Sequence, residues 1–169
     1  LFIGRLQKSK NVQTILKAIG RTNMKDWIFD IVGDGPYRKE LEQLVNRLGI
    51  NRYVRFRGWV TNGSAEHLLY LKKAALFISE SYFESFGVAV VEAIASGCSV
   101  ILSDIEAHRM LVAEKECFTH PDNVELLAQK MSDFIEGKEK FQVDVAQIKK
   151  YDWEIVTDRY EELYNSCFS

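Results

Sequence analysis

Short apolar runs rich in β-branched and aromatic residues recur along the chain, and stretches with helical periodicity separate them. These runs predict six strands, at Leu1–Ile3, Trp27–Val32, Val54–Arg57, Ala75–Ser79, Ser99–Leu102 and, more weakly, Cys117–Thr119. Alternating strands and helices are typical of β-α units around a parallel sheet.

Between the second and third runs, four apolar residues form an i, i+3, i+4, i+7 stripe: Leu41, Leu44, Val45 and Leu48. Pro36 predicts the start of this helix and Gly49 its end. The same period covers 124–135 and 153–164, so we expect the last third to be helical. The pattern predicts an α/β fold with a Rossmann-like, doubly wound, parallel six-stranded sheet and helices on both faces.

The composition fits one globular domain. The chain has 169 residues, 47% of them hydrophobic, with no low-complexity linker and no repeat beyond the β-α alternation. We therefore expect residues 1–169 to form a single domain. With 22 basic and 24 acidic residues, the net charge of −2 argues against a general nucleic-acid-binding surface. Any anion site must be local.

The cysteines and the amino-terminal residues indicate the cellular compartment of the protein. Cys98, Cys117 and Cys167 have no Cys-x-x-Cys spacing, so they are predicted to be free thiols in a reducing compartment. No apolar run approaches membrane-spanning length and no signal peptide precedes the first strand, which favours a cytoplasmic protein. The chain opens directly in an apolar run without methionine, which suggests a fragment of a longer two-domain protein.

In a doubly wound sheet, ligands bind beyond the carboxyl ends of the strands. After the first strand come Gly4 and Arg5, and Lys10 precedes a helix expected to begin near Asn11. Two cations beside a helix start can clamp a diphosphate, because the guanidinium fork and the helix dipole both favour phosphate. A solvated loop explains the same cations.

The second and third strands end in glycine-containing turns. Gly33 and Gly35 permit close backbone approach to a ligand, although a plain strand-to-helix turn explains them equally well. Their spacing is not that of the dinucleotide-binding fingerprint. The third strand ends at Gly58-Trp59-Val60, and the loop Thr61-Asn62-Gly63 that follows has a backbone that can bond a nucleobase edge. Trp59 suits packing as well as stacking.

The segment after the fourth strand is the most specific. Gly87 lies where a helix starts, so the amides of Phe86, Gly87 and Val88 can face an anion. Glu84 precedes this helix and Glu92 lies inside it, which places the two carboxylates on the order of 10 Å apart. Carboxylates accept paired hydrogen bonds from vicinal hydroxyls, so the two suit polyols at opposite ends of a diphosphate.

Glu92 stands in an otherwise apolar helix, which we expect to be buried on most faces. A glutamate there must be paired or bind a ligand; the alternative is a structural glutamate paired with a core cation or reaching solvent.

Other chemistries lack support. His67, His108 and His120 share no metal-ligand spacing and are expected at the surface or at helix ends. No Asp-x-Asp pair follows a strand, so no metal site is predicted. The serines lack a nucleophile elbow.

Taken together, these motifs resemble the group 1 family of retaining GT-B glycosyltransferases, which includes sucrose synthases and bacterial mannosyltransferases. The resemblance covers residues 1 to about 103, continues loosely through 104–109 and resumes at Asp152-Trp153. It implies that the chain is the carboxyl-terminal, donor-binding half of a GT-B fold. A UDP-type or GDP-type nucleotide sugar would then be the substrate, with no cofactor and no metal.

The resemblance also implies roles for individual residues. Arg5, Lys10 and Glu84 would be catalytic, the two cations at the diphosphate and Glu84 facing the transferred sugar. The other donor-binding residues would be Gly4, Gly33, Gly35, Val60, Phe86, Gly87, Val88 and Glu92, with Glu92 at the ribose and the backbone near Val60 at the base.

Partners follow from the same resemblance. An acceptor glycan, lipid or small molecule would be bound by an amino-terminal domain, in polysaccharide or glycolipid biosynthesis. The full-length enzyme would be cytoplasmic and compatible with peripheral association at the inner face of the membrane.

The sequence departs from the family in two places. Ser99 stands where many relatives have proline, and 105–110 lacks the Gly-Gly-x-Pro-Glu pattern of many relatives, so the donor-sugar side differs. A nucleotide-sugar epimerase of the same architecture and a non-catalytic interaction module remain alternatives.

Overall fold

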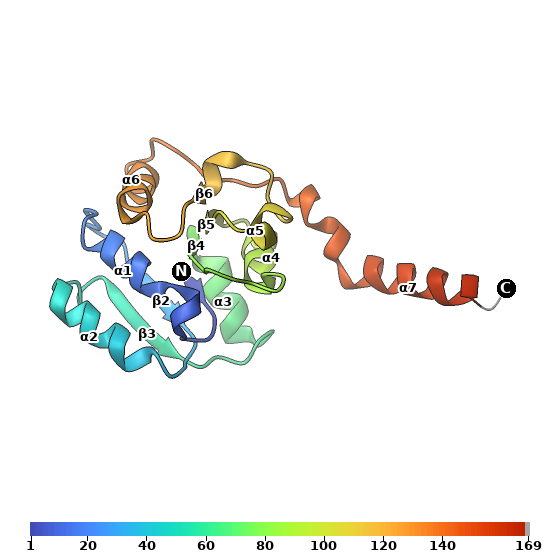
Figure 1. Ribbon diagram of the computed structural model, residues 1–169, viewed down its shortest axis with the longest axis horizontal. Coiled ribbons are helices and arrows are strands. Elements are labelled where there is room, and N and C mark those ends of the chain that lie inside the picture. Colours follow the sequence, from blue (N-terminus) through green and yellow to red (C-terminus); the bar gives the residue numbers. More distant parts are fainter. Residues whose placement is uncertain (168–169) are drawn as a thin grey trace.

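The computed structural model of the protein describes the backbone of residues 1–167 and the side chains of residues 1–166 (Figure 1). The strands are β1 (Phe2–Ile3), β2 (Phe29–Val32), β3 (Val54–Gly58), β4 (Leu76–Ser79), β5 (Ser99–Ser103) and β6 (Phe118–Thr119). The α-helices are α1 (Val12–Ile19), α2 (Arg38–Leu48), α3 (Ala65–Lys73), α4 (Val88–Ala95), α5 (Glu106–Arg109), α6 (Val124–Ile135) and α7 (Trp153–Cys167). Short 3-10 helices are η1 (Lys8–Lys10), η2 (Lys115–Cys117), η3 (Val145–Gln147) and η4 (Lys149–Tyr151).

All six predicted strands are present and every ladder is parallel, which confirms the α/β class. The strands form two three-stranded sheets, β1-β2-β3 and β4-β5-β6, instead of the single six-stranded sheet expected. The division lies at β1, which has only two residues. Two hydrogen bonds bridge it, from the Leu1 amino group to the Leu76 carbonyl at 2.8 Å and from the Ile78 amide to the Leu1 carbonyl at 2.9 Å.

Helices cover both sides of the strands. In Figure 1, α1, α2 and α6 gather on one side, whereas α3 and α4 lie on the other. The buried hydrophobic side chains form one cluster whose members run along the chain from Leu1 to Ile148, the residue between η3 and η4. This two-sided cover explains why every residue of β4 and β5 is buried: such strands are covered on both faces.

Local signals explain most helix boundaries. Gly49 adopts φ 67° and ends α2, as predicted, and α6 spans the predicted range. The helix after Pro36 begins two residues later, at Arg38. The pattern missed α3, because its exposed leucines and its buried His67 reverse the usual separation of apolar and polar faces.

The carboxyl-terminal helix α7 confirms the predicted helical segment, but it projects away from the rest of the chain (Figure 1). Its aromatic residues are exposed, with Trp153 at 82%. Cys98 and Cys117 are buried free thiols, as expected, while the side chain of Cys167 lies outside the described residues. In the described part of the chain, no helix has the length and apolar character that crossing a membrane would require.

Candidate functional site

Two adjoining cavities lie beyond the carboxyl ends of β1, β2, β3 and β4. The first, the Glu84 cavity, has a volume of about 430 Å³. It is lined by seven of the predicted site residues: Gly4, Arg5, Lys10, Glu84, Phe86, Gly87 and Val88. The fold thus brings two segments together, the one that follows β1 and the one that follows β4, as expected at this edge of a parallel sheet.

The second cavity, the Glu92 cavity, has a volume of about 570 Å³. Its predicted members are Gly4, Arg5, Gly33, Val60, Val88 and Glu92, and Trp59, Asn62 and His67 also line it. The Trp59 side chain is 73% exposed, so it is a surface platform at this cavity and not a core residue. Five residues line both cavities: Ile3, Gly4, Arg5, Val88 and Ala89. The cavities therefore form one groove with Arg5 at its middle.

Lys10 and Glu84 form an ion pair in the Glu84 cavity. The Lys10 Nζ donates to Glu84 Oε2 at 2.6 Å, and the Ser81 hydroxyl donates to Glu84 Oε1 at 2.8 Å. Both partners are largely shielded from solvent. An ammonium group has three donors, so Lys10 can hold Glu84 and still donate to an anion in the groove.

The start of α4 faces the same cavity. Gly87 precedes the helix with φ 95°, a left-handed conformation that glycine adopts without strain. The amides of Phe86, Gly87 and Val88 donate no hydrogen bond to any residue that the structure describes. Free amides at a helix start, together with the helix dipole, make a site for an anion.

Helix α4 is less buried than its composition suggests. Val90, Ala93 and Ile94 face the core, but Val88 is 54% exposed and forms part of both cavity walls. The expectation of a helix buried on most faces is therefore wrong, because the groove leaves its first turn open. Glu92 projects from the same helix into the Glu92 cavity with 27% of its side chain exposed.

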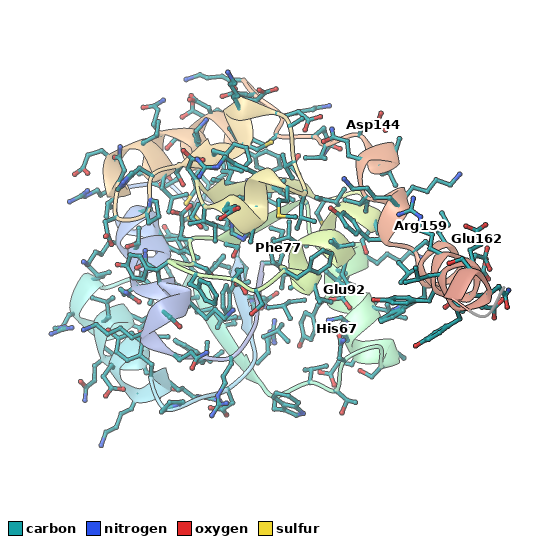
Figure 2. All side chains as sticks on the ribbon, turned by 45° about the vertical axis from the view of Figure 1, so that its right-hand side comes forward. His67, Phe77, Glu92, Asp144, Arg159 and Glu162 are labelled. Carbon is teal, nitrogen blue, oxygen red and sulfur yellow. The ribbon has the colours of Figure 1, made fainter. Side chains whose placement is uncertain are left out.

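His67 lies in the first turn of α3 and His108 in the last turn of α5, as expected of residues at helix ends, but both are buried. His67 is only 2% exposed, and its Nε2 lies 3.6 Å from Glu92 Oε2. Figure 2 shows the two side chains near one another, from α3 and α4. His108 is also buried, in α5, whereas His120 is exposed. The periodic pattern did not indicate that these two histidines are buried, because it follows apolar residues alone.

Gly33 and Gly35 serve different purposes. Gly33 lines the Glu92 cavity with φ 130°, and a Cβ atom on it would lie 2.0 Å from the Gly4 carbonyl oxygen. Gly35 lines neither cavity. A Cβ there would lie 2.3 Å from the Leu6 carbonyl oxygen, so glycine at this position allows the backbone to pack. The structure does not bring Gly35 to the groove.

Buried polar side chains behind the groove support the β4–α4 loop, and no motif or periodic pattern predicts this role for them. The Ser103 hydroxyl donates to the Ser81 carbonyl at 2.6 Å, and His108 Nδ1 bonds the Ser103 carbonyl at 2.9 Å. Burial lowers the pKa of His108. Glu80 accepts a hydrogen bond from Thr119, and burial raises the pKa of Glu80 to about 8. Both groups are therefore neutral supports at neutral pH.

In residues 1–166, no three His, Cys, Asp or Glu side chains are grouped so that they could hold a metal ion. The charged groups that face the groove are two cations, Arg5 and Lys10, and three carboxylates, Asp34, Glu84 and Glu92. Such a groove can bind an anion at its middle and hydroxyl groups at each end.

Comparison with known proteins gives a consistent picture. Residues 1–150 match the family described as "Glycosyl transferases group 1". An uncharacterized glycosyltransferase of Methanocaldococcus jannaschii is 29% identical over 97% of the chain and 44% of its own length. The alpha-monoglucosyldiacylglycerol synthase of Streptococcus pneumoniae is 32% identical over 68% of the chain and 26% of its own length.

Among solved structures, Anabaena HepE in complex with UDP and glucose superposes with a TM-score of 0.83 at 24% identity. The match covers 98% of this chain and 47% of HepE. This similarity shows a shared fold. The chain spans less than half the length of each of these three proteins.

Proposed function

The chain belongs to the group 1 glycosyl transferases, and we propose that it is the donor-binding domain of a retaining enzyme that transfers a hexosyl-type sugar from a UDP or GDP sugar. The acceptor, a glycan, lipid or small molecule, binds a second domain outside this chain. The intact enzyme acts in polysaccharide or glycolipid biosynthesis on the cytoplasmic side of the membrane, with peripheral association.

One observation carries the proposal: the groove has a carboxylate at each end and Arg5 between them. A nucleotide sugar has the matching order of ribose, diphosphate and hexose. Glu92 accepts hydrogen bonds from the ribose hydroxyls, Glu84 faces the hexose, and Trp59 and the backbone of Val60 lie beside the base.

Transfer leaves negative charge on the departing nucleoside diphosphate. Arg5, Lys10 and the free amides at the start of α4 line the same cavity and stabilise that charge by hydrogen bonds and electrostatic attraction. Their positions are fixed before reaction, since Lys10 is held by Glu84 and the amides by the helix. Such preorganised donors stabilise the transition state and need no metal ion.

Two relatives support parts of this proposal. The HepE structure contains UDP and glucose, which agrees with a uridine nucleotide sugar as donor. The Streptococcus pneumoniae relative is named as a synthase of a glucosylated diacylglycerol, which agrees with a lipid acceptor.

A thermal-shift panel of UDP, GDP and ADP with the intact protein tests donor binding. At about 1 mM, a nucleotide with a Kd of about 100 μM stabilises the native state by about 1.4 kcal/mol, or about 4 °C. We expect this shift for at least one nucleotide. Arg5→Ala and Glu92→Ala should each remove it, because they take away the diphosphate clamp and the ribose acceptor.

The matched control is Arg47→Ala, which removes an exposed arginine at the end of α2, away from the groove residues. This variant should keep the full shift. Unchanged melting temperatures with all three nucleotides at millimolar concentration would contradict the proposal.

A further inference from the structure

His67 lies between two walls of the Glu92 cavity, the loop with Val60 and Asn62 and the helix α4 with Glu92. It lies in the first turn of α3, directly after the loop that carries Val60 and Asn62, and its ring faces Glu92 on α4 (Figure 2). Since 2% of the residue is exposed, the ring has little freedom to turn. The loop and the carboxylate are thus joined through one buried side chain.

The hydrogen bonds of His67 determine which ring nitrogen carries the proton. The Gly63 amide donates to Nδ1 at 3.3 Å, so Nδ1 is the acceptor of the neutral ring. The proton is then on Nε2. Nε2 lies 3.6 Å from Glu92 Oε2, and its N–H is therefore presented to the carboxylate.

Glu92 has no other anchor. Among the side chains that the structure describes, none donates a hydrogen bond to the Glu92 carboxylate, and His67 Nε2, 3.6 Å from Oε2, is the one Lys, Arg or His nitrogen within 4 Å of it. A glutamate side chain loses considerable rotamer freedom when it is held in one geometry. Without the Nε2 proton, ligand binding alone would have to offset the entropy cost of fixing the Glu92 side chain.

From this geometry we propose that His67 is a positioning residue for donor recognition. When a nucleotide binds, the Nε2–H closes the 3.6 Å gap to Glu92 Oε2 and holds that atom, which leaves Oε1 free to accept hydrogen bonds from the vicinal hydroxyls of a ribose. The site therefore selects ribonucleoside over 2′-deoxyribonucleoside diphosphates. This inference rests on the proposed function, since it names how the nucleoside end of the same groove recognises its ligand.

Two amide substitutions separate the two contacts of the ring. In His67→Gln, the amide nitrogen takes the place of Nε2 and can still donate to Glu92. In His67→Asn, the amide oxygen takes the place of Nδ1 and can still accept from Gly63, but nothing reaches Glu92. Each variant thus keeps one contact and loses the other.

The experiment measures the Kd of the best-binding nucleoside diphosphate (UDP, GDP or ADP) and of its 2′-deoxy analogue with the intact protein. The wild type should prefer the ribonucleotide by roughly tenfold, the size of one hydrogen bond to a charged group. We expect His67→Gln to keep that preference and His67→Asn to reduce it to about twofold. In a Glu92→Gln background, His67→Asn should have no further effect on the preference.

The outcomes separate this inference from the proposed function. If no nucleoside diphosphate binds the wild type, the proposed function fails. If one binds and His67→Asn keeps the full preference for ribose, the positioning role is overturned while donor binding stands. A purely structural role would lower the melting temperature of both variants and weaken both nucleotides equally, which also overturns it.

Discussion

Among the glycines that the structure describes, Gly33 is the one at which an added Cβ atom would come closest to another atom. Its Cα faces the backbone of Gly4, where the carbonyl oxygen would be 2.0 Å from a Cβ atom, and its φ of 130° lies outside the range that other residues favour. Both glycines line the groove. Close approach of the chain segments after β1 and β2 is thus what forms this wall.

Gly33→Ala should destabilise the protein by about 3 kcal/mol, because one of the two segments must move and the backbone is strained. Gly137→Ala is the control. Gly137 also has a positive φ, 71°, but no atom lies within 4 Å of a Cβ there, so only the conformational cost of about 1 kcal/mol applies. Urea unfolding measures both losses. Equal losses would show that the contact with Gly4 does not matter.

At the level of elements, the β4–α4 loop depends on β5 and β6. Ser81 in this loop bonds Ser103 at the end of β5, and Glu80 bonds Thr119 at the end of β6. Glu80 is fully buried, and its Oε2 has no hydrogen-bond partner among the described residues. The loop that carries Glu84 is therefore held by a neutral carboxyl group.

The pKa of Glu80 rises from 4.5 to about 8 on folding, because burial disfavours the charged form. Stability from this group is full below pH 4.5, where both states are protonated. It falls by about 1.4 kcal/mol per pH unit between pH 4.5 and about 8, since only the unfolded state ionises there. Glu80→Gln should therefore gain stability relative to the wild type as pH rises from 5 to 8.

Chemical denaturation at a series of pH values measures this difference. Glu40→Gln, at an exposed position in α2, is the control and should follow the wild-type profile. A difference between Glu80→Gln and the wild type that stays constant with pH would mean that Glu80 is not neutral in the native state.

At the level of the whole molecule, α7 stands apart from the rest. It projects beyond the body formed by the strands and the helices on both sides of them (Figure 1), and it contacts mainly η4. Its aromatic residues are exposed, while the core cluster ends at Ile148. The residues that bury the core and line the groove thus lie before the helix.

Deleting residues 153–169 should change the melting temperature of the chain by less than about 2 °C, because little apolar surface of the core is uncovered. Phe141→Ala is the comparison. Phe141 is fully buried and packs against Phe134, so its loss should cost about 3 to 5 kcal/mol. Scanning calorimetry distinguishes the two. A deletion as destabilising as Phe141→Ala would show that α7 packs on the body.

The sequence by itself determined the order and type of the elements and where the chemistry gathers. The spacing of apolar and polar residues along the chain specifies strands and helices locally. The loops that follow parallel strands then meet at one edge of the sheet. This is why Arg5, Glu84 and Glu92 could be expected at one site, although Arg5 and Glu92 are 87 positions apart in the sequence.

Only the tertiary structure decided which side chains of separate elements contact one another. The pairing of Lys10 with Glu84, the burial of His67 against Glu92 and the neutral Glu80 behind the loop all join separate elements. It also showed that the two glycines of one turn have different roles: Gly33 lines the groove, whereas Gly35 packs against the backbone of Leu6. Periodicity reports one element at a time, whereas contacts, burial and pKa values depend on what the other elements place beside a residue.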